Sequence, residues 1–567
     1  MWDEKAACAV IGLDEFADVH NVSHPSTHLL TADLIKGQKL TGGAAAVVVG
    51  AGRDDFLDSV DAVERDHNLP RGVRSRRSPK LNASIYWTGE LTPETVDEEI
   101  ALAKKGGFTM MLIYYPVFVG DHVWAYGSLG DYKYNKEYPN GQADVKKVLD
   151  RVKAAGITPG FHTLQTHIGI RSSYVTPVAD SRLNKTRRFT LAQPIAADGD
   201  VGEIRVYENP VDATMHPSVR VLQFGGELFS YEGYETKPPY RFTGVKRGTF
   251  KTAPQAHPVG QVGGTLDLSE FGADSCYIDQ ATDLQDEIAA KIADICDAGM
   301  EFMYFDGSEG ASPPCGINVA RAQYRVTSRF KNPPLFTEGA AKSHFSWHLQ
   351  AGANAFDGFG PEVFKEKILE FPFAEAPEMR KDFTRVDFGW WTVAMPGKRK
   401  DGRFSVGTQP DMWEFGTSKA AAWDCPTAIQ IRSWARKHPR LDDILEAMRR
   451  WEEVRANGFL TEERKALLRD PSKEFHLHPD GKGGYELVEW RQLAVAGKKD
   501  ALVRAFLFES GGKRVVAYWH VMGKGEFELS LPNGGTRRLT AGAMKLFVSD
   551  LTAEELTSAF RSARIHQ

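Results

Sequence analysis

From residue 81 onward, short apolar runs alternate with amphipathic stretches, and this alternation limits what the chain can fold into. The run at 108–116, FTMMLIYYP, shows no polar alternation, which is typical of a strand buried on both faces of a parallel sheet. The stretch at 92–107 has a Thr cap, a Pro in its first turn, apolar residues three and four apart and a terminal Gly, and therefore predicts a helix. Repeated strand–helix units predict a parallel sheet with helices packed outside it.

The number of these units predicts the architecture. Six strands are expected at 81–89, 108–116, 158–164, 302–307, 333–339 and 353–360. We expect the last two strands at 410–416 (PDMWEFG) and 428–432 (AIQIR), although 387–393 (DFGWWTV) competes for the seventh position. With a closing helix at 441–456, the pattern predicts an α/β fold, a (β/α)8 TIM barrel over residues 81–457.

Other segments do not follow the alternation, and a chain of 567 residues is too long for a single core. Residues 1–78 combine short apolar runs with a helical stretch and predict a small N-terminal α/β domain. Residues 170–275 alternate with period two and predict a β-rich insertion after strand three, which could cover a site or form a contact in a homo-oligomer. Residues 475–567 predict a C-terminal antiparallel β-sandwich.

Composition and missing motifs exclude several function classes. The net charge of −5 lacks the basic excess that nucleic-acid binding requires, and no apolar stretch approaches the ~18–20 residues of a membrane span. The five cysteines form no CxxC pair, so we expect neither a disulfide framework nor a bound metal. We expect no cofactor, because no dinucleotide-binding or P-loop motif stands in the required context. The first residues lack the features of a signal peptide, which indicates a cytoplasmic protein or an exported one with a trimmed N-terminus.

Carboxylic acids end three consecutive predicted strands. Asp306 follows the apolar run FMYF, Glu338 ends the fifth strand, and Asp357 ends the sixth. A (β/α)8 barrel places these strand ends on one rim, where its active sites lie. Glycoside hydrolysis needs two such groups, one ionised and one protonated, so all three are candidate catalytic residues. The structural alternative is that each acid shapes a turn or caps a helix.

Further side chains are candidates for binding a glycan substrate. Aromatic rings can stack on sugars, and polar groups near the rim can bind sugar hydroxyls. The structural alternative for a tryptophan is packing in a large core, and the alternative for an acid is a place in the first turn of a helix. The candidates are Tyr115, His162, His167, Glu309, Trp390, Trp391, Asp411, Trp413 and Glu414.

Several of these segments resemble one family of enzymes. The stretch at 138–163 resembles the strand-three region of melibiase-like α-galactosidases, and FMYFDG resembles their fourth strand, with a similar FDG in α-L-fucosidases. The segments AGANAFDGFG and PDMWEFGTS are similar to later parts of the same barrel. The resemblance implies a retaining, exo-acting glycosidase with Asp306 as nucleophile and Asp357 as acid/base, whereas sequence proximity favours Glu338 as acid/base. It does not extend to galactose specificity, because Tyr304 stands where the family has a lysine.

Two other functions compete with this prediction. A polysaccharide lyase acting on a uronic-acid glycan would use Tyr115, His162 or Tyr304 as its base, together with a cation to neutralise the carboxylate. The other alternative is a non-catalytic, glycan-binding barrel. The lyase is distinguished by its unsaturated product, which absorbs ultraviolet light, and the non-catalytic barrel by carboxyl groups that lie far apart.

Overall fold

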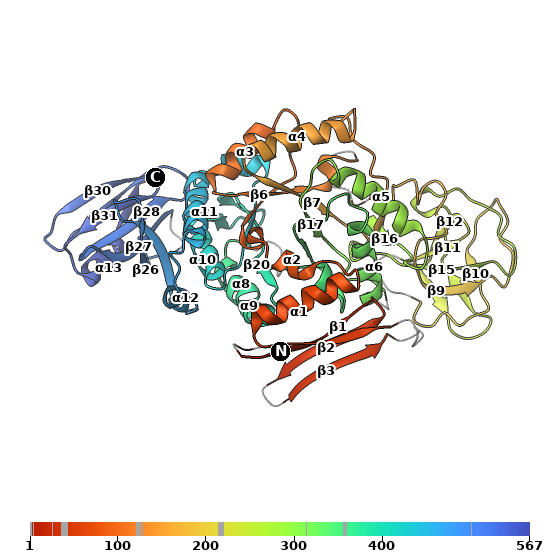
Figure 1. Ribbon diagram of the computed structural model, residues 1–567. Coiled ribbons are helices and arrows are strands. Elements are labelled where there is room, and N and C mark those ends of the chain that lie inside the picture. The colour runs from red at the N-terminus through yellow and green to blue at the C-terminus, as the bar shows by residue number, and fades with distance from the viewer. Residues whose placement is uncertain are drawn as a thin grey trace. The chain divides into compact units, whose positions relative to one another are not determined.

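The computed structural model in Figure 1 describes residues 3–566 with some gaps. The gaps are residue 4 and the segments 25–26, 36–42, 121–125, 127–128, 214–219, 313–314, 355–359 and 500–501. The chain forms two compact units, one of residues 1–78, 113–153 and 159–351 and the other of residues 79–112, 154–158 and 352–567. Among the described residues, no helix is both long and apolar enough to cross a membrane.

The strand order of the largest sheet matches that of the (β/α)8 barrel expected from the sequence. Its strands are, in spatial order, β18 (Thr337–Gly339), β17 (Phe302–Phe305), β7 (Thr158–Thr163), β6 (Met110–Tyr114), β5 (Ile85–Thr88), β24 (Ala428–Gln430) and β21 (Trp390–Thr392). The pairings of β17 with β18 and β7, and of β24 with β5 and β21, are parallel. This is the order of a (β/α)8 barrel opened between its fifth and seventh strands. The expected sixth strand, β19 (Gly352–Asn354), pairs with β20 (Arg385–Asp387), and full closure of the barrel stays a prediction.

The segment 410–416 is helical, so its assignment as a strand is wrong. Helix α10 runs from Pro410 to Ala421, with the proline in the first turn, where its missing N–H has no intrahelical partner to lose. Every residue of α10 is buried, and a helix that is buried all round loses the apolar period by which helices are recognised. The competing segment at 387–393 supplies the seventh strand instead, as β21.

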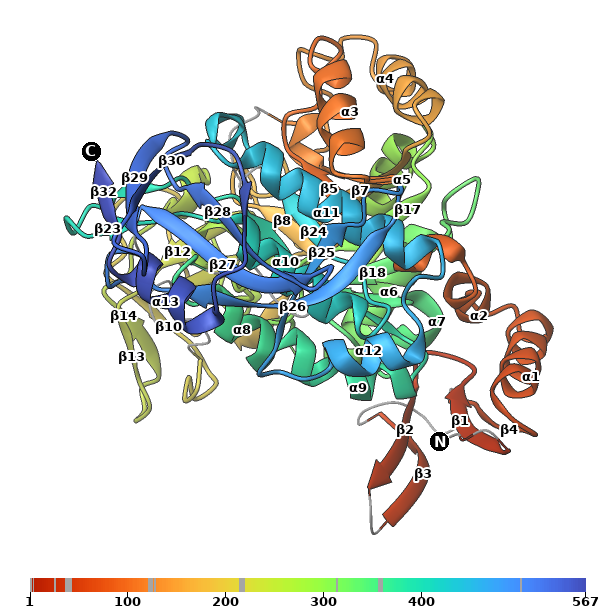
Figure 2. The ribbon, with the colours of Figure 1, turned by 90° about the vertical axis from the view of Figure 1, so that its left-hand side faces the viewer.

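The helices of the first unit are α1 (Arg53–Asp66), α2 (Gly72–Arg76), α4 (Gln142–Ala154), α5 (Leu284–Cys296), α6 (Cys315–Thr327) and α7 (Ser346–Leu349). Two of them differ from what the sequence pattern predicts. Helix α2 lies in the basic stretch 71–80, which is typical of an exposed linker, and α7 is a single turn where the pattern predicts a longer helix over 341–352. Near the N-terminus, β1 (Ala7–Gly12) pairs with β4 (Ala45–Gly50), and β2 (Ala17–His24) pairs with β3 (Thr27–Leu34), whose two arrows lie side by side in red in Figure 2.

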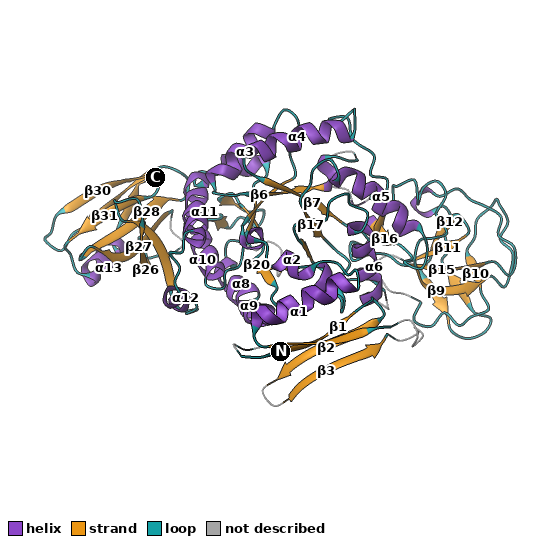
Figure 3. Ribbon diagram, viewed as in Figure 1, coloured by secondary structure: helices purple, strands orange, loops and turns teal. Residues whose placement is uncertain are grey.

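The insertion contains the antiparallel sheets that its period-two pattern predicts, and Figure 3 draws it as strands and loops. One sheet has the order β12 (Glu227–Ser230), β11 (Val221–Phe224), β15 (Val262–Leu266), β9 (Lys185–Thr190). Another has the order β10 (Glu203–Arg205), β14 (Arg241–Thr243), β13 (Gly233–Glu235). Phe189, Phe224, Phe229 and Phe242 contribute to a hydrophobic cluster of the insertion's own. The chain then returns through β16 (Ser275–Tyr277), which pairs with β8 (His167–Gly169).

The second unit combines helices around the strands from β19 onward with an antiparallel C-terminal region. Its further elements before that region are α3 (Val96–Lys105), α8 (Phe364–Glu370), α9 (Pro372–Lys381), β22 (Gly397–Lys398), β23 (Phe404–Ser405), α11 (Leu441–Ala456) and α12 (Glu462–Leu468). Helix α11 spans the residues expected of the closing helix.

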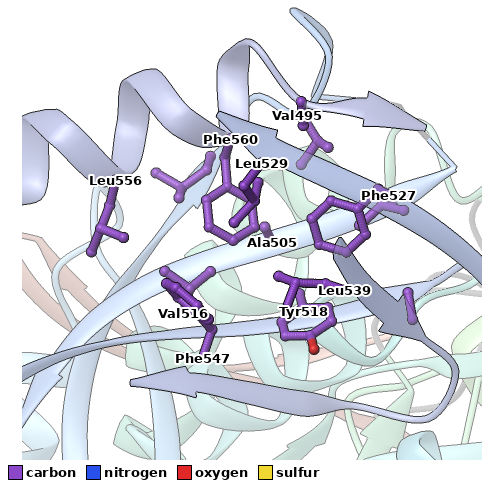
Figure 4. Packing of buried hydrophobic residues seen from close by; sticks show 14 of the residues in the cluster. Val495, Ala505, Val516, Tyr518, Phe527, Leu529, Leu539, Phe547, Leu556 and Phe560 are labelled. Atoms are coloured by element: carbon purple, nitrogen blue, oxygen red, sulfur yellow. The ribbon is translucent and has the colours of Figure 1, made fainter. Parts of the chain in front are cut away.

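Two antiparallel sheets and a helix share one core at the C-terminus. The sheets are β25 (Glu474–Pro479), β26 (Tyr485–Leu493), β27 (Val503–Ser510), β28 (Lys513–His520) and β31 (Lys545–Ser549), and β30 (Thr536–Ala541), β29 (Gly525–Ser530) and β32 (Arg564–His566). Figure 4 shows Phe527 of the smaller sheet and Phe560 of α13 (Ala553–Arg561) within this cluster. The centroids of their two rings lie 5.9 Å apart. These residues form two antiparallel sheets, and their arrangement as a β-sandwich stays a prediction.

Gly416 provides a test of how tightly α10 packs. A Cβ at this position would lie 2.4 Å from the ring of Trp391, which is fully buried. Overpacking of this kind costs about 1–3 kcal/mol, whereas replacing a helical Gly with Ala gains only about 0.5–1 kcal/mol. Gly416→Ala should therefore lower the denaturation midpoint of the protein. Gly202→Ala, where no atom lies within 4 Å, is the matched control, and equal midpoints for the two variants would contradict the packing described here.

Candidate active site

Asp306 is held at the carboxyl end of β17 by the neighbouring strand β7. Its N–H donates to the carbonyl of Thr163 at 2.9 Å, which continues the parallel ladder one residue beyond the strand. Its Oδ2 lies 3.1 Å from Nε2 of His162, so the Nε2–H tautomer of His162 donates to the carboxylate. The side chain of Asp306 keeps 27% of its surface exposed, and this places an oriented carboxylate within reach of solvent.

Aromatic rings fix the orientation of His162, which is itself buried. The imidazole lies nearly parallel to the ring of Tyr304 at 5.4 Å and edge-on to that of Tyr114 at 4.6 Å. Tyr115 lies farther away, with its centroid 6.5 Å from the imidazole, and is almost fully buried. Burial raises the pKa of Tyr115 well above its ordinary value. This hydroxyl is therefore a hydrogen-bonding group in a packed layer, and a poor general base.

Glu338 lies in the same row of side chains, one strand away. Its position on β18 is in register with Tyr304 on β17, which is in register with His162 on β7, so the three share a face of the sheet. Only 1% of Glu338 is exposed, and no described residue hydrogen-bonds either carboxyl oxygen. Burial raises the pKa of Glu338 to about 7. Glu338 is thus a buried carboxylic acid, less accessible than Asp306.

The turn after Asp306 has an unusual backbone. Gly307 and Ser308 both have left-handed conformations, with φ of 68° and 76°. A Cβ at position 307 would lie 2.8 Å from the His167 ring and 3.0 Å from Oε1 of Glu270, so only glycine fits. Ser308 bears the strain of a positive φ, and its buried hydroxyl hydrogen-bonds Thr166 Oγ1 at 2.6 Å. Packing therefore holds a strained turn directly beside the candidate catalytic acid.

Glu270, which sequence reasoning missed, enters this site from the end of the insertion. Its Oε1 accepts from the Ser308 N–H at 2.7 Å, and its Oε2 lies 3.2 Å from His167 Nε2 and accepts from the Tyr277 hydroxyl. Partial burial alone would raise its pKa, but the hydrogen bonds and charge of His167 together with Tyr277 lower the pKa of Glu270 to about 2. No local motif marks Glu270. The pairing of β16 with β8 brings it here, and that pairing joins positions about a hundred residues apart.

Glu309 is the second carboxyl group of this cluster. It follows Ser308, whose N–H donates to Glu270, and precedes Gly310, where a Cβ would lie 3.5 Å from Cβ of Glu270. Partial burial, followed by the nearby carboxylates of Glu270 and Asp306, raises the pKa of Glu309 to about 7, although the residue as a whole remains exposed. His167 contacts Glu270 through Nε2 and the Thr166 hydroxyl through Nδ1, and its expected role in binding substrate stays a prediction. Glu270 and Glu309 thus form a carboxyl–carboxylate pair adjoining Asp306.

The surroundings of this pair add a further acid and an aromatic platform. Asp267 accepts from the Asn184 side chain at 2.8 Å, and burial raises the pKa of Asp267 to about 6. Phe271 stacks on Tyr126 with centroids 4.1 Å apart and planes within 10°. Both aromatic residues are partly exposed. Among the described residues, no cluster of three or more His, Cys, Asp or Glu side chains has the geometry of a metal site.

The remaining candidates belong to the second unit, where they take part in packing. Trp391 and Trp413 are fully buried, and the centroids of their rings lie 4.9 Å apart. Trp390 packs edge-on against Trp87, with ring centroids 4.7 Å apart. The carboxylate of Glu414 is buried and lies 2.6 Å from Nδ1 of His476. Asp357 lies outside the described residues.

Asp411 is fully buried in an ion pair. Arg504 donates to both of its carboxylate oxygens, at 2.9 and 2.7 Å, and Lys365 Nζ lies 2.9 Å away. Burial alone would raise its pKa, but the charges of Arg504 and Lys365 outweigh burial and lower the pKa of Asp411 to about 2. These contacts join α10 to the C-terminal sheet. They pair both carboxylate oxygens of Asp411 within the protein itself.

Removing Arg504 should destabilise the protein markedly. Breaking a buried ion pair leaves an uncompensated charge, at a cost of about 3–5 kcal/mol, and the remaining Lys365 favours the lower end. Arg504→Met should therefore lower the denaturation midpoint at pH 7, whereas Lys146→Met, which breaks an exposed pair with Asp150, should barely change it. Because the pKa of Asp411 is depressed from 3.8, the pair contributes fully above about pH 4, and its contribution falls as pH drops toward 2. If the stability difference between the wild type and Arg504→Met does not become smaller as the pH falls toward 2, this role for Asp411 is contradicted.

Comparisons with known proteins give only distant structural likenesses. No protein-family model matches the chain, and no curated protein matches it. Among solved structures, the galactosidase domain of the α-galactosidase–sucrose kinase AgaSK aligns at 11% identity and a TM-score of 0.38, over 89% of this chain and 60% of that one. The cyclic α-maltosyl-(1→6)-maltose hydrolase of Arthrobacter globiformis aligns at 10% identity and a TM-score of 0.37, over 83% and 99%. Amy13B of Eubacterium rectale aligns at 8% identity and a TM-score of 0.39, over 83% and 96%. This chain therefore spans about three fifths of the AgaSK chain, and its function has to be inferred from its own residues.

Proposed function

We propose that the protein is a glycoside hydrolase that cleaves an oligo- or polysaccharide with Asp306 as its nucleophile. The observation that carries the proposal is the setting of Asp306. An oriented, partly exposed carboxylate at the end of a parallel strand lies in the same region as two carboxyl groups, Glu309 and Glu338, whose pKa values burial raises to about 7. Glycoside hydrolysis requires this combination, because one group must support a cationic sugar centre while another releases the leaving oxygen.

Asp306 would attack the anomeric carbon while a protonated carboxyl group donates to the departing oxygen. His162 would orient Asp306 through its Nε2–H, and the rings around His162 would keep the imidazole from rotating. By resemblance the proton donor is Asp357, and by proximity in sequence it is Glu338. The two residues are alternatives for this role. Because Glu338 is buried, it could act only if the substrate reached the face of the sheet on which it lies.

The lyase alternative receives less support from the same region. Proton abstraction beside a uronic-acid carboxylate needs a base that ionises readily. Burial raises the pKa of Tyr115 well above its ordinary value, which disfavours it as that base. We therefore expect cleaved glycans to yield new reducing ends without an ultraviolet-absorbing, unsaturated product.

Asp306→Asn tests the assignment of the nucleophile. The amide keeps the shape and one acceptor oxygen of the side chain, so the variant should fold normally while losing nearly all turnover in a reducing-sugar assay on a panel of glycans. Asp274→Asn, which changes an exposed acid of the same unit, is the matched control and should retain activity. Wild-type turnover by Asp306→Asn on the substrate that the panel identifies would rule out the nucleophile.

Product stereochemistry tests the retaining mechanism. With a nucleophile and an acid about 5–5.5 Å apart, the first product has the anomeric configuration of the substrate, whereas a gap of about 6.5–9.5 Å gives inversion. We predict retention. Proton NMR spectra recorded in the first minutes of hydrolysis, before mutarotation, would show which anomer forms, and the opposite anomer would make Asp306 a general base instead.

A further inference from the structure

The carboxylate of Glu270 is more heavily hydrogen-bonded than a surface acid would be. Three donors converge on it: the Ser308 N–H, the His167 ring and the Tyr277 hydroxyl. They come from three different segments, the turn after β17, β8 and β16. Charge-assisted bonds of this kind stabilise the ionised form of an acid. Glu270 is therefore the ionised member of any pair that it forms with another acid.

Glu309 lies beside this anion, between Ser308, whose N–H donates to Glu270, and Gly310, where a Cβ would lie 3.5 Å from Cβ of Glu270. Two ionised carboxylates are acceptors only and repel each other, so their proximity favours a proton on one of them. Since three other donors already stabilise the Glu270 anion, that proton belongs to Glu309. Asp306, three positions earlier in the chain, adds a further negative charge that opposes ionisation of Glu309.

Accessibility separates Glu309 from the other protonated acid of this region. A group that protonates a leaving oxygen must reach the substrate, within about 2.6–3.2 Å of that oxygen. Glu338 is 1% exposed, whereas Glu309 is exposed and lies in the same strained turn as Asp306. The left-handed residues Gly307 and Ser308 lie between the two acids and are fixed by contacts with His167, Thr166 and Glu270.

We propose that Glu309 is the proton donor of the reaction and that Glu270, a residue of the insertion, is the positioning residue that keeps the proton on Glu309. This inference rests on the proposed function, and it replaces Glu338 and Asp357 in the role of acid. In the first step the Glu309 O–H proton passes to the glycosidic oxygen as its bond to the anomeric carbon breaks, and Asp306 forms a new bond to that carbon. In the second step a water molecule attacks the same carbon, returns a proton to Glu309 and frees the Asp306 carboxylate.

The arrangement makes activity dependent on pH in a defined direction. Glu309 must be protonated to act, and with its pKa near 7 the rate should fall as pH rises through that value. The ionisable groups that face Glu309 are Glu270, Asp306 and Tyr277, and those that face Glu270 are His167, Asp267 and Tyr277. Replacing Glu270 by the neutral Gln removes the nearest negative charge. It should shift the alkaline limb of kcat/KM to lower pH by about one unit.

Leaving-group dependence tests Glu309. Glu309→Gln should lose about 10²–10⁴-fold in kcat/KM on glycosides whose leaving alcohol needs a proton, and little on aryl glycosides whose phenol leaves without one. Asp306→Asn should lose activity on both. If Glu309→Gln keeps wild-type activity on both while Asp306→Asn is inactive, the role of Glu309 is overturned and the proposed function survives.

The pH profile tests Glu270 separately. Glu270→Gln should show the alkaline limb displaced to lower pH, whereas Glu203→Gln should not. Glu203 is a partly exposed acid of the same insertion, paired with Arg205 and Arg241. An unmoved limb in Glu270→Gln would overturn the positioning role, because loss of packing alone changes the height of the profile but leaves its midpoint in place.

Infrared titration tests the carboxyl pair without any substrate. The difference spectrum between the wild type and Glu309→Gln should contain one protonated carboxyl band that disappears on titration through about pH 7. In a Glu270→Gln background the same difference band should disappear at lower pH. A Glu309 band that is already absent at pH 6 would overturn the inference. A wild type that shows the band but cleaves no glycoside or glycan would overturn the proposed function instead.

Discussion

The parallel pairing of β17 with β7 is the constraint on which the site depends. A single ladder places Tyr304 beside His162 and continues to the hydrogen bond between the Asp306 N–H and Thr163. Because side chains alternate along a strand, Tyr304 and Asp306 project to the same face, and the imidazole of His162 can reach the carboxylate. A slip of one residue in this register would turn Asp306 away from His162 and into the layer that packs against the helices.

The insertion completes what this ladder begins. Its strands form sheets with their own core, and its last strand pairs with β8, directly after the β7 segment that carries His162. This return brings Glu270 and Tyr277 to the turn at 306–309, where they form the polar network around Ser308 and Glu309. A segment that interrupts the barrel pattern in the sequence therefore contributes side chains to the cluster that the barrel strand begins.

Local sequence patterns are sufficient to predict the parallel strands and the candidate acid Asp306, but not the place of Glu270 in the site. The sequence marks Asp306 as a candidate because an apolar run ends abruptly on an acid. It predicts the parallel strands because such runs alternate with capped helices. Glu270 cannot be found in this way, since its role depends on a pairing across the whole insertion. The prediction that Asp411, Trp413 and Glu414 bind substrate rests on assigning 410–416 to a barrel strand. That segment is helix α10, which is buried on all sides and therefore shows no helical period. In the structure the three side chains pack against or pair with other parts of the second unit.

Trapping of the covalent intermediate would identify the nucleophile directly. A fluorosugar that slows hydrolysis of a glycosyl–enzyme, applied to the intact protein and followed by peptide mapping with mass spectrometry, identifies the residue that carries the sugar. We predict a single adduct on Asp306, in the peptide that contains FMYFDGSEG. An adduct on Glu270, Glu309 or Glu338, or efficient glycan hydrolysis with no adduct on any carboxylate, would contradict it.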